Sequence, residues 1–317
     1  MTKTILILIV ASFVLSFVFC AALIPLLRKL GAGQNILSYV KEHKGKGGTP
    51  TMGGLAFVLA AVIISLVACG FADRPFLVAV AVGTGYLLVG FLDDLLKKRR
   101  RDNLGLRPYQ KIIFQTGVAV LASLFCCLNG LTVLKIPYTD FSVDIGWWMM
   151  PLGLFVFLAT VNSVNLTDGL DGLAGSVSGV FFFFLAVLIG LQQGNSNLAA
   201  LSYCLTGALM AYLIFNTNRA SVFMGDTGSL ALGGFAACCA LFSGNALVIP
   251  IVGIMFVFSS ISVIAQVIYY KKTGKRIFLM APVHHHFQEL GYAEGKIVYA
   301  YSAVTAILGI TLLFPFV

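Results

Sequence analysis

The strongest constraint on this chain is a succession of apolar runs of about 18 to 25 residues, each long enough for a helix to cross the hydrocarbon core of a bilayer. Only 10% of the 317 residues are charged and 59% are hydrophobic, whereas a soluble chain carries roughly a quarter charged residues. No polar segment is long enough to form a separate soluble domain. The sequence therefore predicts an all-α integral membrane protein, with residues 1–317 forming a single polytopic membrane domain.

Polar breaks divide the chain into about ten candidate transmembrane helices. The first run leads into Arg28 and Lys29 without a convincing cleavage site, which favours a retained helix over a signal peptide. The spans are expected at residues 4–27, 52–70, 76–95, 111–130, 146–164, 173–191, 197–215, 228–243, 246–270 and 297–316.

The basic residues indicate the orientation of these spans. All but three of the 21 lysines and arginines fall in alternate connections; the exceptions are Lys3, Arg74 and Lys135. Alternate connections lie on the same side of the membrane. Because basic residues concentrate on the cytoplasmic side, the side with the lysine- and arginine-rich connections is predicted to face the cytoplasm, and both termini are predicted to lie outside. The formal charge of +9 then reports orientation and contact with membrane lipid headgroups, and we expect no nucleic-acid partner.

Most of the acidic residues share these connections. Asp93 and Asp94 form an adjacent pair at the end of a predicted span, which suits either a divalent cation or a perturbed general base, but also an ordinary solvated helix end. Asp226 stands between glycines in F-M-G-D-T-G-S, just before a span, where a phosphate or metal-phosphate site and a routine helix cap are both open.

The segment 162–175 carries two further acids between very apolar runs. Asp168 and Asp171 are three residues apart, so both would face one side of a helical turn, and Asn165 would extend that row. Gly169 and Gly172 allow a ligand to approach the backbone closely. Because ionised groups beside membrane helices are expensive, a functional role is favoured over an ordinary polar loop.

Histidines and lysines complete the inventory. The run A-P-V-H-H-H-F at residues 281–287 suits phosphate, nucleobase or proton-transfer contacts better than zinc, because three consecutive histidines cannot all face one way. Lysines precede T-P-T-M-G-G at residues 49–54 and end G-L-R-P-Y-Q-K at residues 105–111, where phosphate ligands and headgroup anchors are both open. Together these groups favour transfer of a phosphorylated group to a lipid acceptor.

The five motifs, in this order along nearly the whole chain, resemble those of the polyprenyl-phosphate phospho-sugar-1-phosphate transferases. They are T-P-T-M-G-G at Thr49, D-D at Asp93, N-S-V-N-L-T-D-G-L-D-G-L at Asn162, F-M-G-D-T-G-S at Phe223 and A-P-V-H-H-H-F at Ala281. The resemblance implies a ten-helix enzyme with a broken ninth helix, which fits Gly253. It departs in two places: Gln288 precedes Glu289 where the family often has an acid directly after the motif, and the loop after Asp94, which bears on the match at Lys111, is short and very basic.

The activity that the resemblance implies is transfer of phospho-MurNAc-pentapeptide from UDP-MurNAc-pentapeptide to undecaprenyl phosphate, giving lipid I and UMP with Mg²⁺ in peptidoglycan synthesis. Carried over by position, Asp93 and Asp94 are the paired acids, with Asp93 as the base. Asp168 and Asp226 belong to the metal-diphosphate region, with Asp226 a direct Mg²⁺ ligand, and His284 is the catalytic histidine.

The resemblance also implies a set of substrate-binding residues. Asp171, Asn216 and Phe223 form the uridine pocket. The phosphates and the nucleotide are held by Lys46, Lys111, Asn165, His284, His285 and His286.

The resemblance further implies a multi-pass protein of the bacterial inner membrane with a cytoplasmic active site, and it is compatible with a homodimer. Two alternatives stay open from the sequence: a UDP-N-acetylhexosamine transferase to the same lipid, and a cation-coupled transporter. Direct attack by the lipid phosphate is predicted, with a covalent phosphoryl-carboxylate at Asp93 or Asp94 as the alternative.

Overall fold

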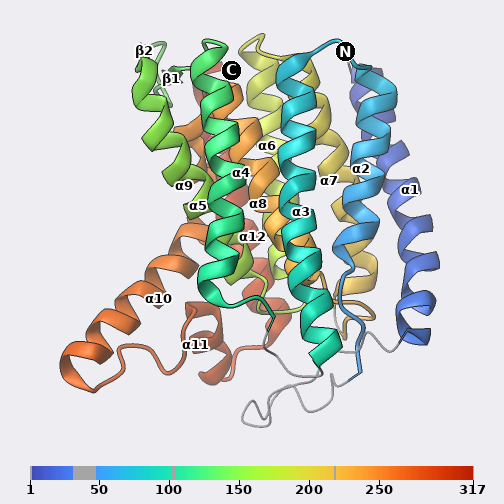
Figure 1. Cartoon of the computed structure of the whole chain (residues 1–317), viewed down its shortest axis with the longest axis vertical. Helices are drawn as coiled ribbons and strands as arrows, with labels where there is room; N and C mark the ends of the chain where they lie inside the picture. Colours follow the sequence, from blue (N-terminus) through green and yellow to red (C-terminus); the bar gives the residue numbers. More distant parts are fainter. Residues whose placement is uncertain (1, 31–47, 101–104, 218, 317) are drawn as a thin grey trace.

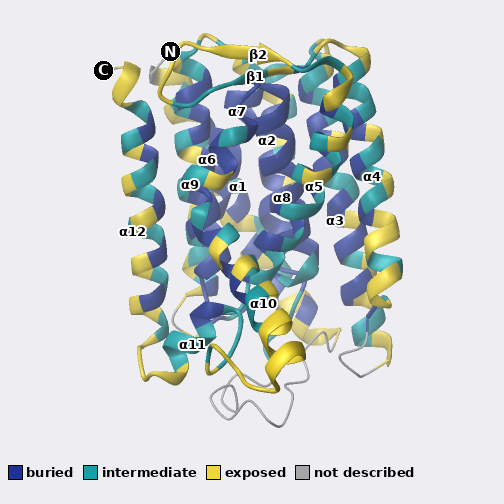
Figure 2. Cartoon of the chain, turned by 90° about the vertical axis from the view of Figure 1, so that its left-hand side faces the viewer, coloured by how far each residue is buried: buried dark blue, intermediate teal, exposed yellow. Residues whose placement is uncertain are grey.

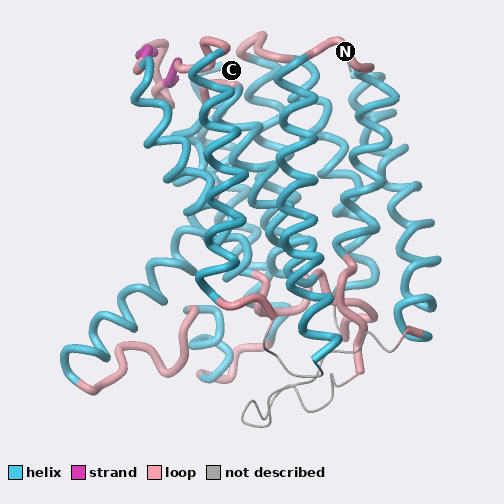
Figure 3. The backbone as a smooth tube through the Cα atoms, in the orientation of Figure 1, coloured by secondary structure: helices cyan, strands magenta, loops and turns pink. Residues whose placement is uncertain are grey.

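The computed structural model describes residues 2–30, 48–100, 105–217 and 219–316. They form a bundle of roughly parallel and antiparallel helices, and a small hairpin lies at one end (Figures 1 and 3). The α-helices are α1 Thr2–Lys29, α2 Gly54–Cys69, α3 Arg74–Arg100, α4 Pro108–Leu128, α5 Met149–Thr167, α6 Leu173–Leu191, α7 Ser196–Asn216, α8 Gly225–Phe242, α9 Ile249–Val252, α10 Ile254–Thr273, α11 Val283–Glu289 and α12 Glu294–Leu313.

The remaining elements are short. Strands β1 Val133–Lys135 and β2 Ser142–Asp144 pair antiparallel, with Leu134 opposite Val143. Three 3₁₀ turns complete the described structure: η2 Gly146–Trp148, η3 Ala246–Val248 and η4 Phe314–Phe316.

The prediction of an all-α membrane protein is confirmed. Within the described residues, nine helices are long and apolar enough to cross a membrane, and α2 is a shorter apolar helix. The predicted span at residues 246–270 is divided into η3, α9 and α10 by a break at Gly253, as the resemblance implied. The two termini lie at the same end of the bundle in Figure 1, as an even number of crossings requires.

Two predicted helix boundaries are wrong in a way that matters for the site. Helix α3 continues to Arg100, well beyond the predicted end at residue 95, because Lys97 to Arg100 lower the hydropathy without ending the helix. Helix α8 begins at Gly225 and not at residue 228. As a result, Lys97 lies on the same helix as Asp93 and Asp94, which the predicted span already contained, and Asp226 lies in the first turn of α8.

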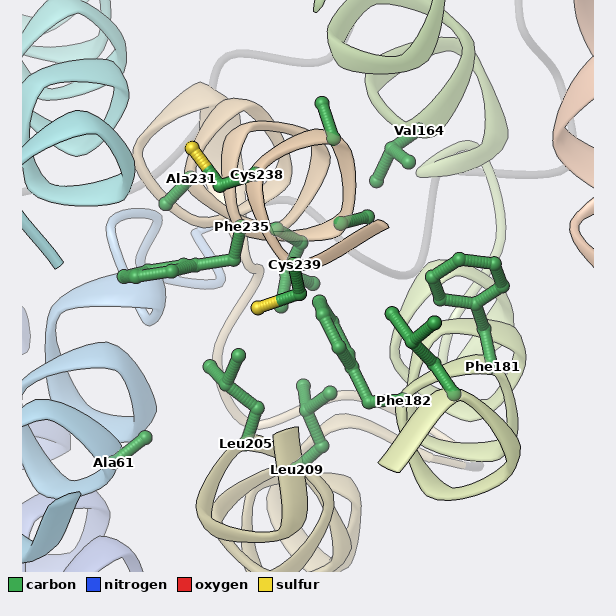
Figure 4. Packing of buried hydrophobic residues seen from close by; sticks show 14 of the residues in the cluster. Ala61, Val164, Phe181, Phe182, Leu205, Leu209, Ala231, Phe235, Cys238 and Cys239 are labelled. Carbon is green, nitrogen blue, oxygen red and sulfur yellow. The ribbon is translucent and has the colours of Figure 1, made fainter. Parts of the chain in front are cut away.

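Helix α8 is the central element of the bundle. Every residue from Thr227 to Phe242 is buried, and α8 packs against α2, α3 and α5. Its sequence is rich in glycine, alanine and cysteine, and such small residues let membrane helices approach closely. Figure 4 shows Phe235, Cys238 and Cys239 of this helix among side chains of α5, α6 and α7.

Glycines mark the closest contacts between helices. A Cβ added to Gly54 of α2 would collide with the backbone of Gly228, and one on Gly233 would meet the backbone of Val161 at 2.5 Å. These contacts hold the first turn of α8 against α2 and its middle against α5. Close packing of this kind constrains the position of α8 against both helices, because a bulkier side chain would not fit.

The outer surface is apolar, as a lipid-facing surface must be. Buried residues concentrate in the middle of the bundle, while exposed residues line the outward sides of α4 and α12 and much of α10 (Figure 2). Helix α10 leans away from the bundle axis at the end opposite the termini (Figure 1). The end that carries α11 and the tip of α10 is also the end of the candidate site.

Candidate active site

The centre of the site is a cluster of three carboxylates from two helices. Asp93 and Asp94 of α3 and Asp226 of α8 each offer an oxygen, and these oxygens lie within 4.8 Å of one another. Asp93 and Asp94 are only 2% and 3% exposed. Asp93-Asp94 and Asp226, two of the three acidic groups noted in the sequence, therefore meet at the end of the bundle that carries α11. An unpaired charge beside membrane-length helices is costly there.

Two lysines neutralise part of this negative charge. Lys97 lies one turn after Asp93 on α3, 2.6 Å from its Oδ2, and also 3.0 Å from Oδ2 of Asp226. Lys111, in the first turn of α4, lies 2.7 Å from the same Asp226 oxygen. Three carboxylates and two ammonium groups leave one net negative charge if all are ionised. A cluster of this composition suits a cation bound to the carboxylates, or a phosphate bound to the lysines in place of their carboxylate partners.

Asp94 is held by the beginning of α8. Its Oδ2 accepts hydrogen bonds from the backbone N–H and the hydroxyl of Thr227 at 3.0 and 2.7 Å, and its Oδ1 accepts the Asp226 N–H at 3.2 Å. A carboxylate at this position satisfies helix N–H groups that have no partner within the helix. Asp94 thus fixes the place of Asp226, whereas Asp93 accepts one backbone hydrogen bond, from Leu106 at 2.7 Å.

Asn165 of α5 links the cluster to a third helix. Its Nδ2 donates to Asp226 Oδ1 and to the Ser229 hydroxyl, both at 2.8 Å. Its Oδ1 lies 3.4 Å from the Lys111 ammonium. On the other side, a Cβ on Gly90 would collide with the backbone carbonyl of Asp226. The predicted phosphate ligands Asn165 and Lys111 are therefore both in contact with the predicted metal ligand.

The segment between α5 and α6 does not form the helical turn expected from its spacing. Helix α5 ends at Thr167, and Asp168 to Gly172 form irregular turns, so Asp168 does not continue a helical row from Asn165. Burial and the negative charges of Asp226, Asp94 and Asp171 raise the pKa of Asp168 well above its usual value. Asp168 is near the carboxylate cluster electrostatically but is not one of its three members.

The predicted uridine residues serve as supports for the loops. Asn216, at the end of α7, accepts the Gly172 N–H and donates to the carbonyl of Val222, both at 2.9 Å. Asp171 accepts the Ala220 N–H at 3.0 Å. Their bonds join the segment after α5 to the segment before α8. Direct contact of either side chain with a nucleotide stays a prediction.

Phe223 lies where the first and fourth motifs meet. Its N–H donates to the carbonyl of Pro50 at 2.8 Å, and its own carbonyl accepts the N–H of Gly53 at 2.9 Å. The N–H of Gly54 then donates to Met224 at 3.1 Å. The half-buried Phe223 ring is thus carried on a paired backbone beside the first turn of α8. The predicted ligand Lys46 lies outside the described residues.

The histidine triplet lies in the first half of α11, where the rings of His284 and His285 lie side by side, with centroids 4.5 Å apart, and His286 contacts Leu279. His284 is fully buried, and both of its ring nitrogens lack a hydrogen-bond partner in the described part of the chain. A Cβ on Gly169 would meet the rings of His284 and His285. Burial, with the neighbouring His285, lowers the pKa of His284 to about 3. His285 bonds to Gln288 at 3.0 Å, and His286 accepts the Leu279 N–H at 3.2 Å.

Sequence reasoning missed two residues that contact the cluster. Lys97 was counted only as a topogenic charge, although its position four residues after Asp93 was a signal once the helix was known to continue. Thr227 was not selected, and nothing in its local sequence distinguishes it from an ordinary helix-start threonine. Its contact with Asp94 depends on the packing of α3 against α8.

Comparison with known proteins identifies first the class of protein that this fold and site define. Residues 76–244, which include nearly all of α3 and the whole of α4 to α8, match the sequence model of glycosyl transferase family 4. The fold is thus that of a membrane-embedded transferase, and the transporter alternative is not supported.

The curated relatives are more specific. The chain is 43% identical over 300 residues to the phospho-N-acetylmuramoyl-pentapeptide-transferase of Clostridium perfringens (strain SM101 / Type A), covering 94% of this chain and 93% of the relative. The same-named protein of Shouchella clausii (strain KSM-K16) is 42% identical over 313 residues, covering 97% and 96%. That of Caldanaerobacter subterraneus subsp. tengcongensis is 43% identical over 297 residues, covering 93% of each chain. The chain belongs to the phospho-N-acetylmuramoyl-pentapeptide-transferase family, and the resemblance seen in the motifs is confirmed.

Proposed function

We propose that this chain transfers phospho-MurNAc-pentapeptide from UDP-MurNAc-pentapeptide to undecaprenyl phosphate at the cytoplasmic face of the bacterial inner membrane. The observation that carries the proposal is the cluster of Asp93, Asp94 and Asp226 with two lysines, at the same end of the bundle as the histidine helix. The names of the relatives support the donor group. The concentration of basic residues at this end supports the cytoplasmic orientation.

The reaction exchanges one phosphoanhydride bond for another. An oxygen of the lipid phosphate forms a bond to the sugar-proximal phosphorus of the donor, the bond from that phosphorus to the bridging oxygen breaks, and UMP leaves with the electron pair. Asp93 takes the proton of a protonated lipid phosphate. The choice of Asp93 over Asp94 is supported by the three hydrogen bonds that hold Asp94 to the start of α8.

The donor atoms of the cluster fit Mg²⁺, which prefers carboxylate oxygens and usually keeps several waters. Asp226 would be the principal ligand, and the bound ion would neutralise charge on the diphosphate. Asp168 stays predicted at the diphosphate side. Lys97 and Lys111 would hold phosphate oxygens once they are released from Asp226, since each reaches the cluster on a flexible side chain.

The remaining roles follow the same division of the site. Lys46, Asn165, His284, His285 and His286 are proposed to hold the phosphates and the nucleotide. Asp171, Asn216 and Phe223 are proposed to form the uridine side, where Phe223 can stack on the base. The two backbone-linked loops support these side chains.

The function is tested with the purified chain in detergent, supplied with undecaprenyl phosphate and either UDP-MurNAc-pentapeptide or UDP-GlcNAc. We expect Mg²⁺-dependent UMP release and a lipid product only with the first donor. A product only with UDP-GlcNAc would overturn the proposal in favour of the hexosamine transferase. Full activity in the presence of a chelator would remove Mg²⁺ from it.

The direct route is tested by omitting the lipid acceptor. Incubation with the donor alone should release no UMP and leave the protein unmodified. Stoichiometric UMP release with phospho-MurNAc-pentapeptide attached through its phosphate to Asp93 or Asp94, found by mass spectrometry, would establish the covalent route instead.

A further inference from the structure

A second polar cluster lies deeper in the bundle than the candidate site. Gln115 of α4 and Asn162 of α5 form a reciprocal amide pair: Asn162 donates to Gln115 Oε1 at 2.8 Å, and Gln115 donates to Asn162 Oδ1 at 3.4 Å. The hydroxyl of Tyr86, on α3, donates to the backbone carbonyl of Gln115 at 3.0 Å. Gln115 and Tyr86 are fully buried. One polar cluster thus joins three helices where lipid-length helices normally carry apolar side chains.

The spacing of these residues repeats that of the site. Gln115 is four residues from Lys111, and Asn162 is three residues from Asn165, so each lies on the same helix face as a site residue, one turn further from the helix end. Tyr86 is seven residues, or about two turns, before Asp93. Each of the three helices therefore presents one residue to the deep cluster and one to the site.

Helix α8 is fitted to the same cluster. A Cβ on Gly234 would collide with the Tyr86 ring, and Gly234 is eight residues, just over two turns, after Asp226. The tight contact sets the rotation of α8 against α3. All four helices that supply Asp93, Lys111, Asn165 and Asp226 thus meet at Tyr86, Gln115 and Asn162.

We infer that the Gln115–Asn162 amide pair, supported by Tyr86, is a positioning device that sets the register of α4 against α5 so that Lys111 and Asn165 reach Asp226 together. The amide pair does not touch the carboxylate cluster. It acts through the two helices, whose ends would slide or rotate if the buried amides had to find other partners. The inference rests on the proposed function only in using UMP release as one of its measurements.

The molecule provides a matched control. Gln192, at the end of α6, and Asn245, in the turn after α8, form the same reciprocal amide pair, at 3.1 and 3.0 Å. This second pair lies at the opposite end of the bundle from the site. Its loss removes the same kind of hydrogen bonds without moving a helix end that carries a site residue.

The experiment compares Gln115→Leu, Asn162→Leu and the double variant with Gln192→Leu, all in the full chain. We expect each variant of the deep pair to lower kcat by about tenfold to a hundredfold, with KM for the donor changed by less than about threefold. The double variant should lose no more than the worse single variant, because the two residues act as one unit. The control should lower the melting temperature but leave kcat within about twofold.

Restoring the pair separates register from packing. The exchange Gln115→Asn with Asn162→Gln keeps both amides and their summed length, so it should recover activity to within about threefold of the wild type, while each half alone does not. These three polar variants also serve if the leucine variants fail to fold. A deep-pair variant that loses melting temperature like the control but keeps kcat within twofold would overturn the inference.

Hydrogen exchange keeps the test independent of the reaction. Gln115→Leu should accelerate amide exchange in the first turns of α4 and the last turns of α5, whereas Gln192→Leu should not. A wild-type chain without UMP release would refute the proposed function alone, because the exchange measurement would still decide the inference. Equal exchange in the two variants would refute the inference while leaving the function in place.

Discussion

The two ends of the bundle solve the same problem, polar groups beside a membrane, in different ways. At the hairpin end, Asp144 accepts from Thr132 and from the Gly146 N–H, both close in sequence. At the site end, Asp93 and Asp226 come from helices far apart in sequence and bring like charges together. The first arrangement forms from local structure, whereas the second exists only through the packing of α3 against α8.

The glycines beside the two polar arrangements also differ, although Gly274 and Gly291, further out at the site end, resemble those of the hairpin. Gly130 and Gly146, near the hairpin, have positive φ angles and open space where a Cβ would stand, so they serve chain reversal. Gly90 and Gly54, near the site, are fitted against the backbone of α8. Bringing the carboxylates of the cluster together costs free energy unless a bound ligand offsets their repulsion. The close packing of Gly90 and Gly54 against α8 holds these groups together despite that cost. The comparison teaches that the site end is organised for electrostatics and the hairpin end for stability.

The largest expected effect comes from neutralising one carboxylate at each end. Asp226→Asn should lower kcat/KM by about a thousandfold, because it removes the acceptor of both lysines and the principal proposed metal ligand. Asp144→Asn, the same change at the hairpin end, should leave UMP release within about twofold. Normal turnover of the Asp226 variant would remove this residue from the mechanism.

A smaller loss is expected when the close packing at the site is disturbed. Gly90→Ala places a Cβ against the carbonyl of Asp226, so α8 must shift, and we expect kcat to fall about a hundredfold. The matched control is Gly85→Ala on the same helix, where the new Cβ would meet Val118 at an ordinary 3.6 Å. Equal kcat in the two variants, with equal amounts of folded protein, would show that the position of Asp226 tolerates this shift.

Much of the fold could be predicted because apolar runs and breaks are local signals. Each predicted span except that at residues 246–270 corresponds to one helix, and α6 has the predicted bounds, Leu173–Leu191. Helix ends were less accurate where charge and helix propensity disagree, as in α3 after residue 95. The hairpin at β1 and β2 was not predicted, since three-residue strands leave almost no periodic signal.

The three carboxylates of the cluster were among the residues predicted from the sequence, but their geometry and their partners Lys97 and Thr227 were not. Motif order and topology brought Asp93, Asp94 and Asp226 to one face before any coordinates were known. The helical row from Asn165 through Asp168 was wrong, because the chain leaves the helix at Thr167 and turns at Gly169 and Gly172. The bonds of Asp94 to α8 were not predictable either, since the partners are 132 and 133 residues apart.

A modest pH effect should come from the buried histidine of the site end. The pKa of His284 is lowered to about 3 in the folded chain, whereas an unfolded histidine titrates near 6.5. Below about pH 6.5 the unfolded state therefore binds a proton that the folded state does not, and stability falls by up to about 1.4 kcal/mol per pH unit from this group. Above that pH the group contributes no pH dependence.

The measurement compares the melting temperatures of the wild type and His284→Gln in detergent from pH 8.5 to pH 5. The difference between the two should be constant from pH 8.5 to about pH 7.5, and the wild type should lose melting temperature faster than the variant as the pH falls below about 6.5. Parallel curves over the whole range would show that His284 is charged or accessible in the folded state.

The smallest effect on activity is expected at the hairpin end, where Lys135 joins β1 to the Gln192–Asn245 pair through a 2.9 Å hydrogen bond to Gln192 Oε1. Lys135→Met keeps most of the aliphatic stem and removes one hydrogen bond, which costs about 1 kcal/mol of stability. The melting temperature should fall by a few degrees while kcat stays within about twofold. Lys111→Met is the matched variant at the site, because Lys111, like Lys135, donates a hydrogen bond to a side chain on another element. It should lose a similar amount of melting temperature but, unlike Lys135→Met, it should lower kcat. If Lys135→Met lowered kcat as much as Lys111→Met, the two ends would be coupled, and the division between a stabilising end and an electrostatic end would not hold.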